Sequence, residues 1–133
     1  MRFTVPATDT EFEIPDTWWE EASIKGFAPA ALTYRYKAHP EEPVHLLSLD
    51  DIEPPLRDPG IAGLRRDRTL RILVGFVAGD AIDPVPTDAP PGQRAFSHRV
   101  RDGYHRYCCS IAAGYTHLPC IVLPYFDIRD PNC

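Results

Sequence analysis

A chain of 133 residues is long enough for one domain that buries about two thirds of its unfolded surface, so folding requires neither a disulfide nor a metal. Its composition, 44% apolar and 25% charged, is that of an ordinary globular protein. No apolar run approaches the roughly 20 residues that a membrane helix needs, and the first residues lack the apolar stretch of a signal peptide. We therefore expect a cytoplasmic protein without a membrane segment.

The net charge of −5 argues against a general nucleic-acid binder, but the charges are unevenly placed. Residues 1–55 contain 11 acidic and 4 basic residues, whereas residues 56–133 contain 8 acidic and 10 basic residues. Most of these side chains are expected on a solvated surface. The alternative for the second part is a site for an anion.

The four cysteines do not form a recognisable framework. Cys108 and Cys109 are adjacent, Cys120 opens an apolar run, and Cys133 ends the chain. This spacing lacks the paired C-x-x-C pattern of a zinc site, and it predicts small buried apolar residues with one cysteine loose at the terminus. The histidines are also scattered, and we expect no metal site in His39, His45, His98 and His117.

Residues 1–40 are expected to form an N-terminal extension. Thr4–Ile14 can supply one or two short strands, and Thr17–Glu20 fits a capping box that opens a short helix before Gly26. The segment is rich in aromatic residues, namely Trp18, Trp19, Phe27, Tyr34 and Tyr36. We expect these side chains to pack the extension onto the main domain; the alternative is a surface for a partner or for base stacking.

Residues 41–133 are expected to form the main domain. Val44–Leu49 is typical of a strand, and the chain must leave regular structure at the prolines that follow. Leu64–Gly79 has the spacing of an amphipathic helix that ends at its glycine; the predicted apolar face is Leu70, Leu73, Val74 and Val77. Arginines near the helix start oppose its dipole, so they extend into solvent or serve a nearby anion; they are Arg65, Arg66, Arg68 and Arg71.

The second half of the main domain predicts a hairpin followed by a helix and a strand. Asp83–Pro86 and Ala95–Arg101 are the hairpin strands, joined by a turn rich in proline. A helix over Arg106–Ala113, stopped by glycine, leads to a buried strand at Leu118–Leu123, which gives a βαβ-like unit. The fold class is α/β (α+β), a single small domain with a mixed β-sheet flanked by short helices.

The segment from Asp102 to Arg106 has the features of an anion site. A helix N-terminus offers backbone N–H groups without internal partners and about half a positive charge, which together stabilise an anion. Gly103 allows a close approach of the chain, and His105 and Arg106 add donors at the same place. The alternatives are that His105 is a structural histidine and that Asp102 only caps the turn.

A longer string around this turn resembles a known superfamily. Arg101–Tyr107, Ala112–Tyr115 and Leu118–Val122 are similar to the conserved box of ParB-like N-terminal domains in the ParB/sulfiredoxin superfamily. The resemblance covers roughly residues 44–126 and leaves residues 1–40 unmatched. It implies a ParB/sulfiredoxin-like fold that binds a nucleoside triphosphate, ATP or CTP, with Mg²⁺ left open. The implied phosphate-binding residues are Asp102, Gly103, Tyr104, His105 and Arg106, together with Arg57 from a looser alignment.

The sequence differs from the superfamily at several points, and these differences argue against some of its known activities. Sulfiredoxins are similar in this box but have a cysteine where this chain has Tyr104, which argues against sulfiredoxin activity. The chain leaves no room for a helix-turn-helix domain after the box, which argues against sequence-specific DNA binding. The superfamily also includes free-serine kinases, in which a carboxylate activates a hydroxyl group. By that analogy the catalytic candidates are Asp50, Asp51 and Glu53, although none of them falls on a motif that aligns securely.

Two hypotheses follow. The first is a nucleotide-phosphate-binding domain that acts as a phosphotransferase or a nucleotide hydrolase. The second is a noncatalytic protein-interaction module, such as an antitoxin or an accessory protein, that binds a protein partner through residues 1–40. The sequence leaves open whether the chain is an enzyme.

Overall fold

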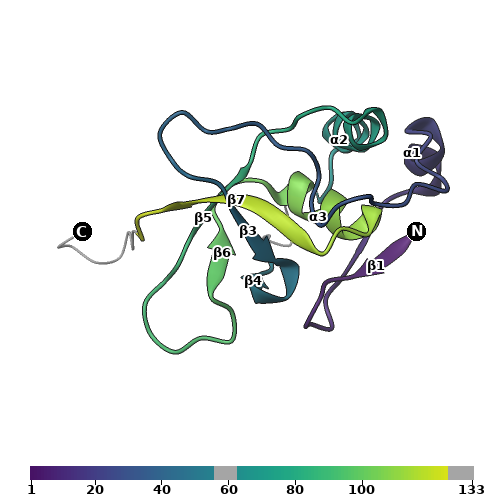
Figure 1. The fold of residues 1–133 in the computed structure, drawn as a ribbon. Coiled ribbons are helices and arrows are strands. Elements are labelled where there is room, and N and C mark those ends of the chain that lie inside the picture. The colour runs from purple at the N-terminus through teal and green to yellow at the C-terminus, as the bar shows by residue number, and fades with distance from the viewer. Residues whose placement is uncertain (56–62, 126–133) are drawn as a thin grey trace.

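A five-stranded mixed sheet carries the fold, and the computed structural model describes residues 1–55 and 63–125 (Figure 1). The strands follow the spatial order β3 (His45–Ser48), β7 (His117–Leu123), β5 (Val85–Asp88), β6 (His98–Val100) and β4 (Ile52–Glu53). The neighbouring pairs alternate along this order: β3–β7 and β5–β6 are antiparallel, whereas β7–β5 and β6–β4 are parallel. The predicted class, one small domain with a mixed sheet and short helices, is confirmed.

The sheet curls because its two edge strands are joined by a very short link. Only the 3-10 turn Leu49–Asp51 separates β3 from β4. An extended link of this length reaches about 14 Å, whereas the edges of a flat five-stranded sheet lie about 19 Å apart. Backbone hydrogen bonds fasten the link at both ends, from Leu49 N to Thr116 O and from Ser97 N to Asp51 O, each 3.0 Å long. The edges are therefore drawn toward each other.

Three helices and a small hairpin complete the described fold. They are β1 (Arg2–Thr4), β2 (Glu11–Glu13), α1 (Asp16–Glu21), α2 (Arg66–Ala78) and α3 (Tyr104–Ala113). Helix α3 packs against both β7 and α2, and α1 packs against α2, so the helices gather on one side of the sheet (Figure 1). None of the described helices is long and apolar enough to span a membrane.

The short N-terminal helix forms where it was expected, but its start differs from the prediction. The residue before the helix is Pro15, and no side chain caps it. Because α1 already begins at Asp16, Thr17 lies inside its first turn and cannot act as the predicted cap. The helix ends at Glu21, with Ala22 as its C-cap, before it reaches Gly26.

Helix α2 ends at Gly79 as predicted, with a φ of 73° in the left-handed region. Its buried face differs from the predicted one, because Val74 and Val77 remain 46% and 45% exposed. The predicted Leu73 does enter the core and Leu70 packs against it, while Phe76, which the prediction left out, is buried beside them. The ring of Phe76 stacks on Tyr34 at 5.4 Å between centroids, so a tertiary partner selects which apolar side chains are buried.

The hairpin after α2 is confirmed, while the expected βαβ-like unit is only partly correct. Strand β5 extends to Asp88 because Thr87 and Asp88 pair with β6 on one side and β7 on the other. Strand β7 lies parallel to β5, on the side opposite to β6. The parallel pair is therefore β5 and β7, and the connection between them contains both β6 and α3.

Residues 1–40 share the core of the rest of the domain. Val5, Ile24 and Tyr34 are buried in the same cluster as the core residues of the helices and the sheet. Phe27 also contacts Tyr115 in an edge-on arrangement, with centroids 6.1 Å apart. The expectation that aromatic side chains pack this segment onto the main domain is confirmed; of these side chains, Tyr36 stays exposed.

Three of the four cysteines are buried and are not in disulfides: Cys108, Cys109 and Cys120. Their predicted role as small apolar core residues is confirmed, and Cys133 lies outside the described residues. Burial raises the pKa of the Cys120 thiol to about 12, and the nearby charge of Arg106 opposes part of this shift. Within residues 1–55 and 63–125, no group of three or more His, Cys, Asp or Glu side chains is placed to hold a metal ion.

Candidate functional site

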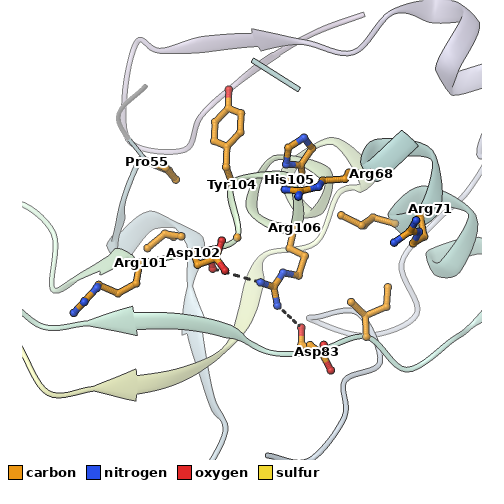
Figure 2. A pocket seen from close by; sticks show the side chains of 13 residues that line it. Pro55, Arg68, Arg71, Asp83, Arg101, Asp102, Tyr104, His105 and Arg106 are labelled. Atoms are coloured by element: carbon orange, nitrogen blue, oxygen red, sulfur yellow. Dashed lines mark hydrogen bonds between the residues drawn. The ribbon is translucent and has the colours of Figure 1, made fainter. Parts of the chain in front are cut away.

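A cleft of about 730 Å³ lies where α2, the entrance to β5 and the start of α3 meet (Figure 2). This volume is in the usual range for small-molecule sites, roughly 300–1,000 Å³. The described residues that line it are Pro55, Arg68, Arg71, Ile72, Ile82, Asp83, Val100, Arg101, Asp102, Gly103, Tyr104, His105 and Arg106. The turn predicted from the sequence thus forms one wall, and α2 forms another.

Gly103 opens α3 in a conformation that requires glycine. Its φ is 133°, and a Cβ placed there would lie 2.9 Å from Cγ1 of Val85 and 3.3 Å from Nη2 of Arg106. The helix that follows has Gly103 as its N-cap, with no side-chain cap. The first-turn N–H groups therefore lack acceptors within the helix, at a point where the chain lines the cleft.

His105 joins the two helices that border the cleft. Its ring is 6% exposed, and Nε2 accepts a 2.8 Å hydrogen bond from the backbone N–H of Arg65, the residue before α2. An accepting Nε2 carries no proton in this arrangement. This contact fixes the start of α2 beside the start of α3, and the predicted contact between His105 and phosphate stays a prediction.

Arg106 fastens the turn to the entrance of β5. Its Nη1 donates to the carbonyl oxygens of Asp83, at 3.2 Å, and Pro84, at 2.8 Å, and its Nη2 donates to the carbonyl oxygen of Asp102 at 3.4 Å (Figure 2). The Tyr34 hydroxyl donates to the same Asp83 oxygen at 2.8 Å. Because all of these acceptors are neutral, the positive charge of Arg106 beside the cleft has no carboxylate partner among the described residues.

Arg68 and Arg71 are the two arginines of α2 that line the cleft, and both are exposed. Neither guanidinium group makes an ion pair or a hydrogen bond in the part of the chain that the structure describes. The other arginines nearby differ. Arg66 pairs with Glu21, and Arg101 turns away from the start of α3 to bind the buried carboxylate of Asp88 at 2.9 Å.

The predicted catalytic carboxylates do not reach this cleft. Asp50 and Asp51 are exposed in the 3-10 turn between β3 and β4, and Glu53 on β4 forms a hydrogen bond with Arg94. None of the three is among the described residues that line the cleft. Arg57, the other predicted phosphate ligand, lies outside the described residues.

Among the residues that the structure describes, the carboxylates that do line the cleft are those of Asp83 and Asp102. The sequence predicts Asp102 at the site, whereas it predicts Asp83 only as the start of a strand. The signal that could have found Asp83 is its position two residues before β5, because the chain that enters this strand passes beside the start of α3. Lys37 lies 3.9 Å from Oδ1 of Asp83 at the exposed rim.

Tyr104 and Pro55 line both this cleft and a second cavity of about 290 Å³. The second cavity lies between the N-terminal hairpin, represented by Val5 and Phe12, and α3, represented by Tyr107. The Tyr104 ring packs edge-on against His105, with centroids 5.8 Å apart. Residues about 100 positions apart in the sequence form this cavity, so no local pattern could have indicated it.

Comparison with known proteins adds no relative to this picture. No protein-family model matches the chain, and no curated protein matches it in sequence. The functional evidence lies in the cleft, which is lined by a glycine-opened helix start and by two arginines of α2 that have no partner among the described residues.

Proposed function

We propose that the cleft binds the phosphate groups of a nucleotide at the start of α3. The observation that carries the proposal is the meeting of two features in one cavity: the first-turn N–H groups of α3, opened by Gly103, and the guanidinium groups of Arg68 and Arg71. Backbone N–H groups at a helix start bind phosphate oxygens, and an arginine can engage two oxygens at once. Among the described residues, the guanidinium groups of Arg68, Arg71 and Arg106 line the cleft without a carboxylate partner, against the two carboxylates of Asp83 and Asp102, and this balance favours an anionic ligand.

The resemblance of the Asp102–Arg106 box to ParB/sulfiredoxin-like domains supports this proposal and extends it to a nucleoside triphosphate, ATP or CTP. In the proposed complex, the backbone of the turn contacts phosphate oxygens, while His105 and Arg106 hold the turn in place through their hydrogen bonds. A Mg²⁺ ion that accompanies the phosphates would take oxygen ligands. Asp83 and Asp102 are the carboxylates available for it in the cleft.

The reaction proposed with this site is phosphoryl transfer or nucleotide hydrolysis. Both reactions depend mainly on positioned charge, and the cleft combines guanidinium groups with two carboxylates. Thiol chemistry is not part of the proposal, because Tyr104 occupies the position of the sulfiredoxin cysteine and Cys108 and Cys109 are buried. Phe27 and Tyr34 pack into the domain, so these two side chains are not available to the partner surface of the interaction-module alternative.

Isothermal titration of the full chain with ATP, ADP and CTP, each with and without magnesium, tests the proposal. We expect saturable binding at one site. Absence of binding at millimolar nucleotide under all of these conditions would overturn the proposed function.

A matched pair of glycine variants tests the location of the site. Gly103→Ala is expected to lower nucleotide affinity at least tenfold, because the new Cβ would overlap Val85 and force the turn to move. Gly92→Ala is the control: its φ of 93° carries a similar left-handed strain, but no atom lies within 4 Å of the new Cβ. Circular dichroism checks that both variants fold. Equal nucleotide affinity in folded Gly103→Ala and the control would place the ligand elsewhere.

A further inference from the structure

We infer that Arg68 and Arg71 bind the outer phosphates of the ligand, so that the cleft prefers a nucleoside di- or triphosphate to a monophosphate. The inference rests on the proposed function and assigns to α2 a role that the Asp102–Arg106 box does not include. Its starting point is the contrast among the arginines of one helix. Arg66 is neutralised by Glu21, whereas Arg68 and Arg71 line the cleft without any such contact among residues 1–55 and 63–125.

The placement of these two arginines has a cost for the free protein. Arg68 lies in the first turn of α2, where a cation opposes the helix dipole by about 0.3–1 kcal/mol. Arg71 follows one turn later, so two like charges share one side of the helix. The described acidic residue in this first turn, Asp67, lies 3.6 Å from Arg66 and does not offset the pair. An anion in the cleft would relieve both unfavourable terms.

The two groups of hydrogen-bond donors proposed to bind phosphate lie on different walls of the cleft. Figure 2 shows Arg68 and Arg71 on the α2 side, the Asp102 turn on the other side, and Arg106 between them. The hydrogen bond from Arg65 N to His105 Nε2 ties these walls together at 2.8 Å, which fixes their separation. A phosphate held by the N–H groups of α3 therefore occupies one wall, and the next phosphates along the chain extend toward the arginines on the other.

This arrangement predicts how affinity depends on phosphate number. A monophosphate can contact only the N–H groups of α3, so the arginines of α2 add little to its affinity. A di- or triphosphate engages both walls and adds charge-assisted hydrogen bonds, which are among the stronger hydrogen bonds in proteins. We expect ADP and ATP to bind at least tenfold more tightly than AMP.

The experiment compares two double variants that each remove two positive charges. Arg68→Gln with Arg71→Gln removes the proposed ligands, and glutamine retains good helix propensity. Arg35→Gln with Arg66→Gln is the control, because neither residue lines the cleft. Both proteins and the wild type are titrated with AMP, ADP, ATP and inorganic tripolyphosphate, and circular dichroism checks the fold. The cleft variant is expected to lose at least tenfold in affinity for ATP and tripolyphosphate, with AMP binding nearly unchanged.

The outcomes separate this inference from the proposed function. If the wild type binds nucleotides and the cleft variant retains the ATP-to-AMP preference, the arginine assignment is wrong and the proposed function stands. An equal loss in the control would show a general charge effect and would also overturn the assignment. If the wild type binds tripolyphosphate but no nucleotide, and only the cleft variant loses it, the arginine assignment stands and the nucleotide function fails. If the wild type binds none of the probes, both are wrong.

Discussion

The sequence predicts the location of Arg106 correctly, but the hydrogen bonds of its side chain in the structure go to backbone carbonyl groups and not to a phosphate. Its position in the turn predicts a guanidinium beside the cleft, and the structure places it there. The acceptors it uses are the carbonyl groups of Asp83 and Pro84, about 20 positions earlier in the chain. His105 behaves in the same way, because its Nε2 accepts from the backbone of Arg65. Residue type sets the hydrogen-bonding capacity of a side chain, and tertiary structure decides which groups use it.

Cys120 makes the folding stability depend on pH in the alkaline range. Burial raises the pKa of its thiol from 9.0 to about 12, so above pH 9 the unfolded chain releases a proton that the folded chain retains. The Cys120 thiol therefore makes its full contribution to the free energy of unfolding below pH 9, and this contribution declines as the pH rises toward 12. Urea unfolding at pH 7 and pH 10, in reducing buffer, should show that Cys120→Ala loses about 1 kcal/mol less than the wild type over this interval. Equal losses in the two proteins would contradict the shifted pKa.

At the scale of elements, local signals predicted where most helices and strands lie but not which face of each is buried. Gly79 and Gly114 both end helices with left-handed backbones, which is a property of glycine itself and can be predicted locally. The buried face of α2 depends instead on Phe76 meeting Tyr34, a residue of the N-terminal segment. Similarly, β5 extends to Asp88 only because strands on both sides pair with it.

Replacement by alanine at two adjacent positions of α2 should therefore change the free energy of unfolding by very different amounts. Leu73 is fully buried, and Leu73→Ala is expected to lower the free energy of unfolding by about 2–5 kcal/mol. Val74 is 46% exposed, and Val74→Ala should change stability by less than about 0.5 kcal/mol. Urea titration monitored by circular dichroism measures both. Comparable destabilisation by the two changes would mean that α2 buries the face first predicted from its periodicity.

At the scale of the whole molecule, the unmatched first 40 residues are part of one core with the rest of the chain. Val5, Ala22, Ile24 and Tyr34 are all at most 3% exposed and belong to the cluster that also contains Leu73. The sequence marked this segment as separate because it matches no motif. Hydrophobic burial does not depend on such similarity, since any apolar surface that covers the helices stabilises the fold.

A chain that starts at residue 41 is accordingly expected not to fold cooperatively. It would expose the apolar surface that the N-terminal segment covers, including the face of Phe76 that stacks on Tyr34. Urea unfolding and amide proton dispersion in NMR spectra, each compared with the full chain, check this. A sharp unfolding transition in the truncated chain would show that residues 1–40 are an accessory to an independent domain.

Some residues of the candidate site could be predicted from the local sequence, whereas others are brought to the cleft only by tertiary packing. The turn around Gly103 could be predicted, because a glycine just before a helix indicates a backbone conformation that other residues rarely adopt. The φ of Gly103 is 133°. The α2 arginines reach the cleft through the packing of α2 on α3, and Asp83 lies there beside the hydrogen bond that Arg106 donates to its carbonyl oxygen, so no pattern within one segment could have brought them together. The predicted carboxylates Asp50, Asp51 and Glu53 lie close to a strand in sequence, but neither they nor any residue of β4 is among the described residues that line the cleft.

The carbonyl oxygen of Asp83 accepts hydrogen bonds from both Tyr34 and Arg106, and this shared acceptor has a thermodynamic consequence. Any ligand that favours the folded turn at Gly103 also favours the arrangement in which Tyr34 is docked. Linkage is reciprocal, so whatever holds the N-terminal segment in place must strengthen ligand binding by the same factor. Substitutions in the first 40 residues are thus expected to tune affinity at a cleft to which none of those residues belongs.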